Sequence, residues 1–295
     1  MKTATMNKKS MLIIDGNNLA HRAQHKFNLS TAEGKPSSVV YGFVYVLNSL
    51  IKRMSPNQVV VAFDGGSHPE RLKILPGYKA RDHRMGEDEY QAFTDQIAFL
   101  RANLNLAGVT VVHERYMEAD DLIYMVVRNN PKLYKTIVSS DKDFNQLLSP
   151  NTKIYNPFRE AYITSVNCKQ EFGYESRQCV DYLCLDGDKS DKIPGVPGMG
   201  PVRITQFLEE FYSVEDYLES DDKGKWVKYP IEEVWKRNRQ VISLGLFYRK
   251  FLKGKPLKGY PASFDPKEAH KVFFREYQVR IFQNPEVIET FKRLT

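Results

Sequence analysis

Four short runs of β-branched and other apolar residues alternate along the chain with helical patterns. The runs cover residues 11–14, 59–63, 109–112 and 136–138. Each is nearly continuous in apolar residues, as buried parallel strands are. Between them, apolar side chains recur three and four positions apart over residues 41–54 and 87–104, which is typical of helices with one buried face. Strands that alternate with helices predict an α/β fold with a central, mostly parallel sheet flanked by helices.

Acidic residues follow every predicted strand. Asp15 and Asp64 end the first two strands, the third leads into EADD at residues 118–121, and Asp141 and Asp143 follow the fourth. The carboxyl ends of parallel strands converge on one crevice, so these carboxylates are expected to meet. A single aspartate after a strand is more often a turn former or a helix N-cap. Several unpaired carboxylates in one crevice repel one another unless cations neutralise them, and oxygen ligands suit Mg²⁺ or Mn²⁺. The pattern therefore predicts a metal site.

A second acidic segment, residues 186–191, precedes a stretch rich in glycine and proline at residues 193–201. A helical pattern follows over residues 202–211. A glycine-rich hairpin that leads into a helix presents backbone N–H groups that can hold a phosphate without reading a base. A tight turn between two helices explains the same stretch equally well.

Charge and composition narrow the class of protein. The 295 residues are 42% hydrophobic, enough for a core, and 43 Lys and Arg against 36 Asp and Glu give a net charge of +7, which favours a polyanionic partner. Basic residues gather at 68–84, with little helical periodicity, and at 221–260, where a solvated face is an equal alternative. The first cluster begins directly after Asp64, which suits a phosphate-bearing substrate. Three cysteines without a C-x-x-C pair, and no signal or membrane segment, predict a cytoplasmic protein.

Several motifs occur in a fixed order along the chain. They are residues 12–19 (LIIDGNNL), 62–64 (AFD), 78–80 (YKA), 118–121 (EADD), 139–143 (SSDKD) and 187–200 (GDKSDKIPGVPGMG). Together they resemble the 5′-nuclease or flap endonuclease family, particularly the nuclease domain at the N-terminus of bacterial DNA polymerase I and its free-standing bacterial and phage relatives. The resemblance extends to about residue 211 and is weaker beyond.

The resemblance implies two divalent ions, Mg²⁺ with Mn²⁺ as a substitute. One ion would be held chiefly by Asp15, Asp64, Glu118, Asp120 and Asp141. The other would be held by Asp121, Asp143, Asp188 and Asp191. Some of these ligands would act through water.

The resemblance also implies how the substrate is held. Lys79 and Arg22 would face the scissile phosphate, and Tyr78 would stack on a nucleobase. The position three residues after the lysine, often basic in relatives, is Asp82 here, so either Arg81 or Arg84 would assist Lys79.

A helix-hairpin-helix element would grip the duplex backbone, with a bound K⁺. Its residues would be Gly195, Gly198, Gly200 and Arg203, the last beside Val202, where relatives commonly carry a lysine. Contacts of this kind to the DNA backbone carry little base readout.

In domain terms the resemblance implies an α/β nuclease core at 1–180, of the type called PIN-like. A helical arch at about 66–100 would admit a free 5′ end. Residues 181–295 would form a helical DNA-binding region, containing the helix-hairpin-helix and packed on the core. The expected activity is a 5′→3′ exonuclease and flap endonuclease in replication and repair, acting on DNA with free 5′ ends, flaps or nicks and on RNA–DNA hybrids. We expect a monomer in a bacterial or phage-infected cell, either free-standing or working beside a separate DNA polymerase.

Two other functions fit parts of the pattern. A phosphatase of the haloacid dehalogenase type also places an aspartate after the first strand, but it needs a second aspartate where this chain has Asn17. A DNA-binding protein with a degenerate nuclease site is the second alternative. Nine carboxylates would hinder simple DNA binding, which argues against it.

Overall fold

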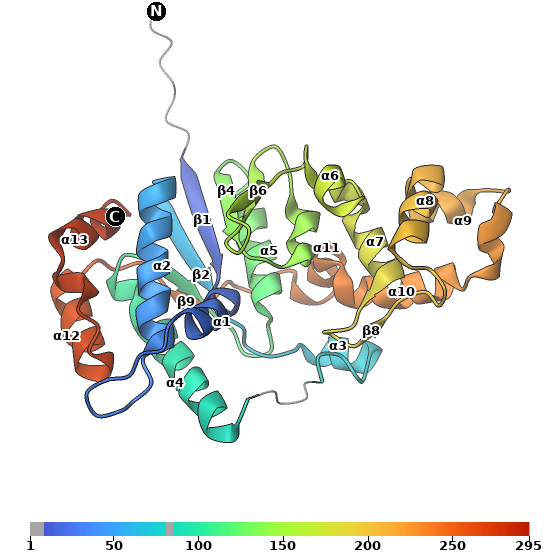
Figure 1. The fold of residues 1–295 in the computed structure, drawn as a ribbon. Helices are drawn as coiled ribbons and strands as arrows, with labels where there is room; N and C mark the ends of the chain where they lie inside the picture. Colours follow the sequence, from blue (N-terminus) through green and yellow to red (C-terminus); the bar gives the residue numbers. More distant parts are fainter. Residues whose placement is uncertain (1–8, 81–84, 295) are drawn as a thin grey trace, which may run out of the picture. The chain divides into compact units, whose positions relative to one another are not determined.

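The fold is shown in Figure 1 as a computed structural model, which describes residues 9–80 and 85–294. The chain forms two compact units, each assembled from separate stretches of sequence. Unit 1 comprises residues 1–65, 83–139 and 257–295, and unit 2 comprises residues 66–82 and 140–256.

Unit 1 contains the parallel sheet that the apolar runs predict. Its strands lie in the order β4, β1, β2, β3 and β9, and the first four are parallel. β9 pairs with β3 in the antiparallel direction and was not predicted, since a two-residue strand leaves no periodic signal. The strands are β1 (Ser10–Asp15), β2 (Gln58–Ala62), β3 (Thr110–Val112), β4 (Tyr134–Val138) and β9 (Gly259–Tyr260).

The helices of unit 1 bury one face each against this sheet or against one another. In α2 the buried side chains include Val40, Phe43 and Leu47, spaced three and four residues apart as the sequence predicts. Both α1 and α5 contact β1 and β2. The helices are α1 (Gly16–Lys26), α2 (Ser38–Met54), α4 (Glu87–Asn103), α5 (Ala119–Asn129), α12 (Pro266–Tyr277) and α13 (Pro285–Lys292), with 3₁₀ turns η1 (Leu104–Leu106) and η6 (Ile281–Gln283).

Unit 2 is mainly helical and carries two small antiparallel pairs, β5 with β6 and β7 with β8. Its helices are tied by the buried carboxylate of Asp181, which accepts hydrogen bonds from the indole of Trp235 at 2.6 Å and from the backbone N–H of Val214 at 3.0 Å. The first elements of unit 2 are α3 (Pro69–Ile74), η2 (Lys142–Leu147), β5 (Thr152–Asn156), β6 (Ala161–Ile163), α6 (Cys168–Phe172), η3 (Ser176–Gln178) and α7 (Cys179–Asp186). The rest are β7 (Gly187–Asp188), β8 (Ile193–Pro194), α8 (Pro201–Phe211), α9 (Val214–Glu219), η4 (Gly224–Lys228), α10 (Ile231–Ile242), α11 (Leu244–Phe247) and the π-helical turn η5 (Tyr248–Leu252).

The start of the basic segment at 68–84 is a helix, which corrects the expectation of little helical structure there. α3 begins with Pro69 at its first position, and the Nδ1 atom of His68 accepts a hydrogen bond from the backbone N–H of Glu70. Arg71 is 1% exposed, donates from Nε to the carbonyl of Val241 at 3.1 Å, and lies 3.8 Å from the ring centre of Phe247. The sequence did not predict this helix, because the residue that it buries is a charged arginine and not an apolar one.

The compact units do not follow the domain division at residue 180 that the sequence suggested. Residues 257–295 group with unit 1, because β9 pairs with β3 and the N–H of His113 donates to the carbonyl of Lys258. The division at 180 stays a prediction about domains. Within the described residues, no helix combines the length and the apolarity needed to cross a membrane.

Candidate active site

In unit 1, Asp15 ends β1 and caps α1. Its Oδ1 accepts a hydrogen bond from the backbone N–H of Asn18 at 3.0 Å, and its Oδ2 accepts one from the hydroxyl of Ser139 at 3.1 Å. Both Asp15 and Ser139 are buried. The N-cap role that sequence statistics favour is therefore confirmed. Two neutral donors, a backbone N–H and a hydroxyl, thus orient this carboxylate.

Asp64 follows β2 in the same unit. Its backbone N–H donates to the side-chain Oδ1 of Asn17 at 2.9 Å. Asn17 stands at the position where a haloacid dehalogenase phosphatase needs its acid, and here it serves to fix the backbone of Asp64. The preceding carbonyl, that of Phe63, lies 3.3 Å from Nδ1 of His113.

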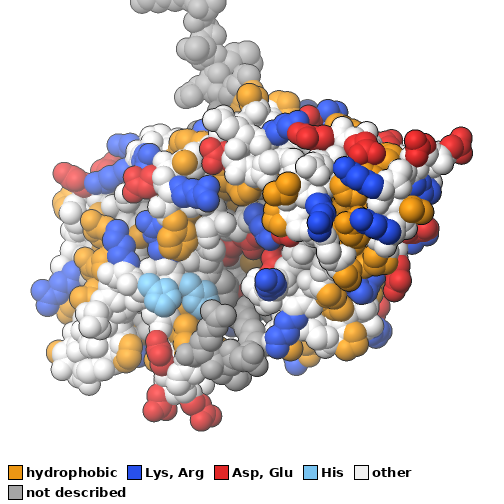
Figure 2. All heavy atoms as spheres, turned by 45° about the vertical axis from the view of Figure 1, so that its right-hand side comes forward, with side chains coloured by type: hydrophobic (Ala, Val, Ile, Leu, Met, Phe, Trp, Pro, Cys, Tyr) orange, Lys and Arg blue, Asp and Glu red, His pale blue; other side chains and the backbone are white. Residues whose placement is uncertain are grey.

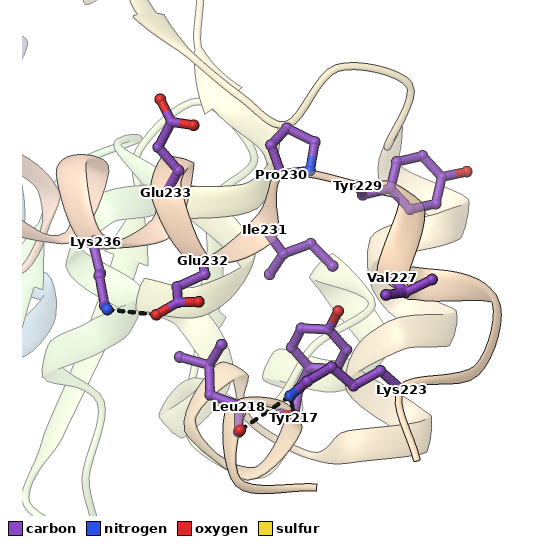
Figure 3. Close-up of a pocket in the computed structure, with 10 residues that line it drawn as sticks. All are labelled: Tyr217, Leu218, Lys223, Val227, Tyr229, Pro230, Ile231, Glu232, Glu233 and Lys236. Atoms are coloured by element: carbon purple, nitrogen blue, oxygen red, sulfur yellow. Dashed lines mark hydrogen bonds and ion pairs between the residues drawn. The ribbon is translucent and has the colours of Figure 1, made fainter. Parts of the chain in front are cut away.

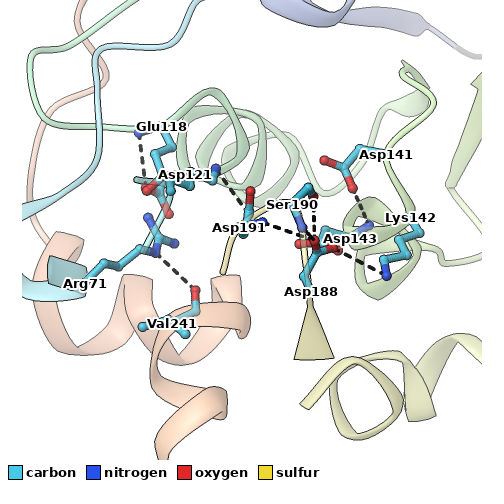
Figure 4. A network of polar contacts seen from close by, with 11 residues as sticks. Arg71, Glu118, Asp121, Asp141, Lys142, Asp143, Asp188, Ser190, Asp191 and Val241 are labelled. Carbon is cyan, nitrogen blue, oxygen red and sulfur yellow. Dashed lines mark hydrogen bonds and ion pairs between the residues drawn. The ribbon is translucent and has the colours of Figure 1, made fainter. Parts of the chain in front are cut away.

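The EADD stretch opens α5 through a capping box. Glu118 is the N-cap, and its backbone N–H donates to Oδ2 of Asp121 at 3.4 Å. Glu118 and Asp121 are each 1% exposed, and Figure 4 shows them side by side at the start of the helix. Acidic groups here also benefit from the positive end of the helix dipole. The helix predicted to run to about residue 127 ends at Asn129.

In unit 2, Asp141 is the N-cap of the turn η2 that contains Asp143, and its Oδ1 accepts from the backbone N–H of Asp143 at 2.9 Å. Burial raises the pKa of Asp143 well above its usual range, and the charges of Asp141, Asp191 and Asp188 raise it further. Only Lys142 acts in the opposite direction. The negative charges of the four aspartates therefore repel one another, as those of a cation-binding cluster would.

Asp188 ends β7, and Asp191 lies in the loop between β7 and β8. Oδ1 of Asp188 accepts hydrogen bonds from the backbone N–H groups of Ser190 at 2.8 Å and Asp191 at 3.2 Å, and from the Ser190 hydroxyl (Figure 4). Burial tends to raise the pKa of Asp188. The hydrogen bond from Ser190 and the charge of Lys142 outweigh that effect, so this pKa lies below its usual range.

Two lysines stand among the aspartates of unit 2. Nζ of Lys79 lies 3.7 Å from Asp191 and Nζ of Lys142 lies 3.4 Å from Asp188. Burial tends to lower the pKa of Lys142, yet the neighbouring carboxylates, Asp188 first, outweigh it and the pKa is raised. Lys79 has a left-handed backbone, with φ at 50°, and its N–H donates to the carbonyl of Asp191. The lysine that the YKA motif singles out is therefore tied to an acidic loop more than a hundred residues away.

These carboxylates fit hard cations by the chemistry of their donors. All nine predicted ligands offer carboxylate oxygens, the donor type that Mg²⁺ and Mn²⁺ prefer, and burial together with neighbouring aspartates raises the pKa of Asp143. Within residues 9–80 and 85–294, no three Asp, Glu, His or Cys side chains stand close enough together to hold one ion as they are oriented. The assignment of particular ligands to each of two ions stays a prediction.

The other predicted substrate contacts meet different surroundings. Arg22 lies on α1, and its Nε and Nη1 atoms are buried. Tyr78 is 5% exposed, so stacking on a nucleobase would require its ring to move outward. Arg81 and Arg84 lie outside the described residues, so the choice between them stays open.

The glycine-rich stretch folds into a tight hairpin that leads into α8. Gly187 has φ at 73°, and a Cβ there would lie 2.3 Å from the backbone nitrogen of Gly195, so both the turn and the close approach require glycine. Gly200 is the N-cap of α8, and the guanidinium of Arg203 donates to the carbonyl of Gly198. A tight turn before α8 agrees with both alternatives that the sequence left open. Its contact with a phosphate backbone stays a prediction.

Most of the second basic segment, residues 221–256 of 221–260, lies in unit 2 and is largely a solvated face. Lys236 pairs with Glu232 at 2.5 Å and Arg239 with Glu215 at 2.6 Å. On the face drawn in Figure 2, lysine and arginine side chains are interspersed with aspartate and glutamate. This arrangement favours the solvated-face alternative over a continuous basic patch.

A pocket of about 440 Å³ in unit 2 is lined by α9, η4 and α10 (Figure 3). Its lysines are engaged within it, Lys236 with Glu232 and Lys223 with the carbonyls of Tyr217 and Leu218. No charged group converges on its centre, so it offers no recognisable ligand chemistry.

Sequence reasoning missed several residues that hold the predicted ligands. Asn17 and Ser139 lie inside the family motifs, two residues from Asp15 and Asp141, so their place in a motif was a usable signal. Lys142 could have been found between Asp141 and Asp143. His113 lies in no motif, and nothing in the sequence marks it.

Comparison with known proteins supplies the family. Residues 10–173 match the family described as 5'-3' exonuclease, N-terminal resolvase-like domain, and residues 174–244 match 5'-3' exonuclease, C-terminal SAM fold. A 5'-3' exonuclease of Aquifex aeolicus is 35% identical over 218 residues, which cover 73% of this chain and 74% of the relative. DNA polymerase I of Bacillus subtilis is 31% identical over 235 residues, 77% of this chain but only 26% of the polymerase.

Solved structures share the fold at lower identity. T5 5'-exonuclease with bound divalent zinc ions superposes with a TM-score of 0.69 at 22% identity, covering 97% of both chains. Flap endonuclease-1 from Methanococcus jannaschii superposes with a TM-score of 0.57 at 14% identity, covering 97% of this chain and 92% of the other. The matched residues contain the carboxylates described above, and by sequence the chain belongs to the 5′-3′ exonuclease family of nucleases.

Proposed function

We propose that this protein is a divalent-metal-dependent 5′ nuclease that acts as a 5′→3′ exonuclease and 5′-flap endonuclease. Family membership supports the nuclease activity on DNA. One observation carries the metal dependence: burial first, and then the nearby charges of Asp141, Asp191 and Asp188, raise the pKa of Asp143 well above its usual range. A bound cation would relieve the repulsion between the carboxylates of such a cluster.

The nine carboxylates named above are the proposed ligands of two ions, Mg²⁺ or Mn²⁺. When bound, two such ions supply an activated water at neutral pH and stabilise the charge on the phosphate and the leaving oxygen. The protein holds these ligands in place through donors such as Ser139 to Asp15 and Asn17 to the backbone of Asp64. A serine or cysteine nucleophile is therefore unnecessary.

Lys79 is proposed to stabilise the charge that gathers on the scissile phosphate. Its Nζ lies within the acidic cluster at 3.7 Å from Asp191, and its backbone is anchored to the same residue. An ammonium held in this way needs little reorganisation when a phosphate arrives, which is the property that makes electrostatic stabilisation effective. Arg22, with Arg81 or Arg84, is proposed to assist, and Tyr78 to stack on a base once its ring is released.

The hairpin from Gly195 to Gly200, with Arg203, is proposed to bind duplex backbone and K⁺. Such contacts fix orientation without reading sequence, so we propose structure-directed cleavage in replication and repair, extending to RNA primers hybridised to DNA. The similarity to DNA polymerase I supports a separate polymerase as partner. A monomer in the cytoplasm is the working proposal for assembly and location.

The decisive experiment uses a 5′-labelled flap, a nicked duplex and a blunt duplex, each with Mg²⁺ and with chelator. We expect release of the flap with Mg²⁺ only, and loss of cleavage in Asp141→Asn. Asp221→Asn, an exposed aspartate outside the ligand set, is the matched control and should cleave like the parent. An intact flap with Mg²⁺, or an active Asp141→Asn variant, would refute the assignment.

The same samples separate the alternatives. A phosphatase of the haloacid dehalogenase type would hydrolyse a small phosphomonoester and leave the flap intact. A degenerate DNA-binding protein would retain the flap in a gel-shift experiment without cutting it at any Mg²⁺ concentration.

A further inference from the structure

The backbone around Asp64 is fixed at nearly every polar atom. The N–H of Asp64 donates to Asn17, and the N–H of Gly65 donates to the carbonyl of Met117 at 2.8 Å. The carbonyl of Gly65 accepts from the N–H of Tyr116, also at 2.8 Å. A Cβ on Gly65 would lie 1.8 Å from the carbonyl oxygen of Glu114, so the close approach of this turn to its neighbour admits only glycine.

The carbonyl of Phe63, on the peptide that directly precedes Asp64, has a partner as well. It faces Nδ1 of His113 at 3.3 Å. On the other side of the ring, Nε2 of His113 lies 2.7 Å from Nη1 of Arg101, a residue in the last turn of α4. The three groups form a chain from α4 through the imidazole to the end of β2.

The chemistry of the guanidinium decides which atom donates and which accepts in these two hydrogen bonds. An arginine side chain only donates hydrogen bonds, so Nε2 of His113 must accept. A neutral imidazole that accepts at Nε2 carries its proton on Nδ1, and Nδ1 then donates to the carbonyl of Phe63. Arg101 therefore selects the tautomer that can hold the Phe63–Asp64 peptide.

We propose that Arg101 and His113 are a positioning pair that fixes the plane of the Phe63–Asp64 peptide and thereby aims the carboxylate of Asp64. The inference rests on the proposed function, in which Asp64 is a metal ligand. Partners that orient a ligand typically change metal affinity 10- to 100-fold when they are removed. Neither residue touches substrate in this role, and neither belongs to the motifs that mark the family resemblance.

Two amide substitutions at His113 separate its contact with Arg101 from its contact with the Phe63 carbonyl. The amide nitrogen of asparagine takes the place of Nδ1, so His113→Asn keeps a donor to Phe63 and loses the partner of Arg101. The amide of glutamine takes the place of Nε2, so His113→Gln keeps a partner for Arg101 and loses the donor to Phe63. The two variants are matched in polarity and in the loss of the ring.

The main measurement is Mn²⁺ binding, followed by electron paramagnetic resonance in the absence of DNA. We expect His113→Gln to weaken Mn²⁺ binding by about tenfold, while His113→Asn stays close to the parent. Arg101→Gln should weaken binding less than His113→Gln, because the ring remains but its tautomer is no longer selected. Affinity for a flap in chelator should be the same in all variants. Equal Mn²⁺ affinity in His113→Gln and the parent, or an equal loss in His113→Asn, overturns the proposal.

A second measurement tests the pair by itself. Nitrogen-15 NMR of the parent should show His113 protonated at Nδ1, and Arg101→Gln should shift the signals toward a mixture of tautomers. A parent protonated at Nε2 overturns the positioning pair whatever the metal does. A parent that shows this tautomer but binds no Mn²⁺ refutes the proposed function and the role of the pair in metal binding together.

Discussion

Neutral donors hold carboxylates in both units, and in unit 2 two lysines also face them. In unit 1, Asp15 is held by a hydroxyl and a backbone N–H, and the backbone of Asp64 by an amide. In unit 2, Asp188 and Asp191 face the ammonium groups of Lys142 and Lys79. Neutral donors orient a carboxylate without cancelling its charge, whereas lysines cancel part of it. The two groups should therefore differ in how mutation, pH and cations affect them.

The largest expected effect is on turnover when a proposed ligand is neutralised in either unit. Asp15→Asn and Asp143→Asn should each lower flap cleavage by at least about 10²-fold, since both remove charge from the proposed site. Thermal unfolding in chelator should separate the two variants. Asp15→Asn loses well-made hydrogen bonds and should be destabilised by about 1–2 kcal/mol, while Asp143→Asn removes repulsion and should raise Tm. The same sign for both would contradict the contrast between the units.

The next effect concerns the lysines that lie among the aspartates of unit 2. Lys79→Ala should lower single-turnover cleavage by about 10²-fold while flap affinity changes little, because its charge acts on the phosphate during reaction. Lys189, an exposed lysine between Asp188 and Asp191, provides the control, and Lys189→Ala should retain activity. A loss in affinity alone would rule out the catalytic role of Lys79.

A smaller effect is expected in the pH dependence of stability. The folded-state pKa of Asp143 is raised, so between its unfolded and folded pKa values the folded state binds more protons. The free energy of unfolding should therefore fall as pH rises through that window, and the lost stability should return on acidification. Denaturant unfolding from pH 4 to 8 in chelator should show this slope in the parent and a flatter one in Asp143→Asn. Identical slopes would show that Asp143 titrates normally.

The smallest effect is expected for the neutral donor to Asp15. Ser139 is fully buried, and Ser139→Ala removes the hydroxyl that donates to Oδ2 of Asp15. We expect a loss of about 1 kcal/mol in the free energy of unfolding and a modest fall in turnover. Ser140→Ala, the neighbouring residue, is the comparison, and an equal effect there would show that the Asp15 contact is not responsible.

The apolar runs and helical periodicities predicted the sheet and its flanking helices well. β1, β2, β3 and β4 lie where the continuous apolar runs are, because a strand buried on both faces has no other composition. The short strand β9 and the helix α3 were not predicted, because elements of two and six residues show too little periodicity. Arg71 also misled the prediction, because its charge is buried through contacts with Val241 and Phe247 far away in sequence.

Candidate ligands were predictable because each one directly follows a strand or opens a helix, positions that sequence pattern marks. The residues that form hydrogen bonds with these ligands were harder to predict. Ser139 and Asn17 lie within motifs, but only the fold shows which carboxylate each one serves. The burial of Tyr78, predicted to meet a nucleobase, is also a tertiary fact, since an isolated YKA sequence does not show which side of the tyrosine is covered.

By itself, the sequence determined the parallel sheet, the placement of acidic residues at strand ends and the family to which the chain belongs. These are local properties, set by the order of apolar and charged residues. Only the tertiary structure decided which donor holds each carboxylate, that Lys79 meets Asp191, and that Arg101 reaches the peptide before Asp64 through His113. Hydrogen bonds depend on distances between atoms, and residues that are remote in sequence come within those distances only when the chain is folded.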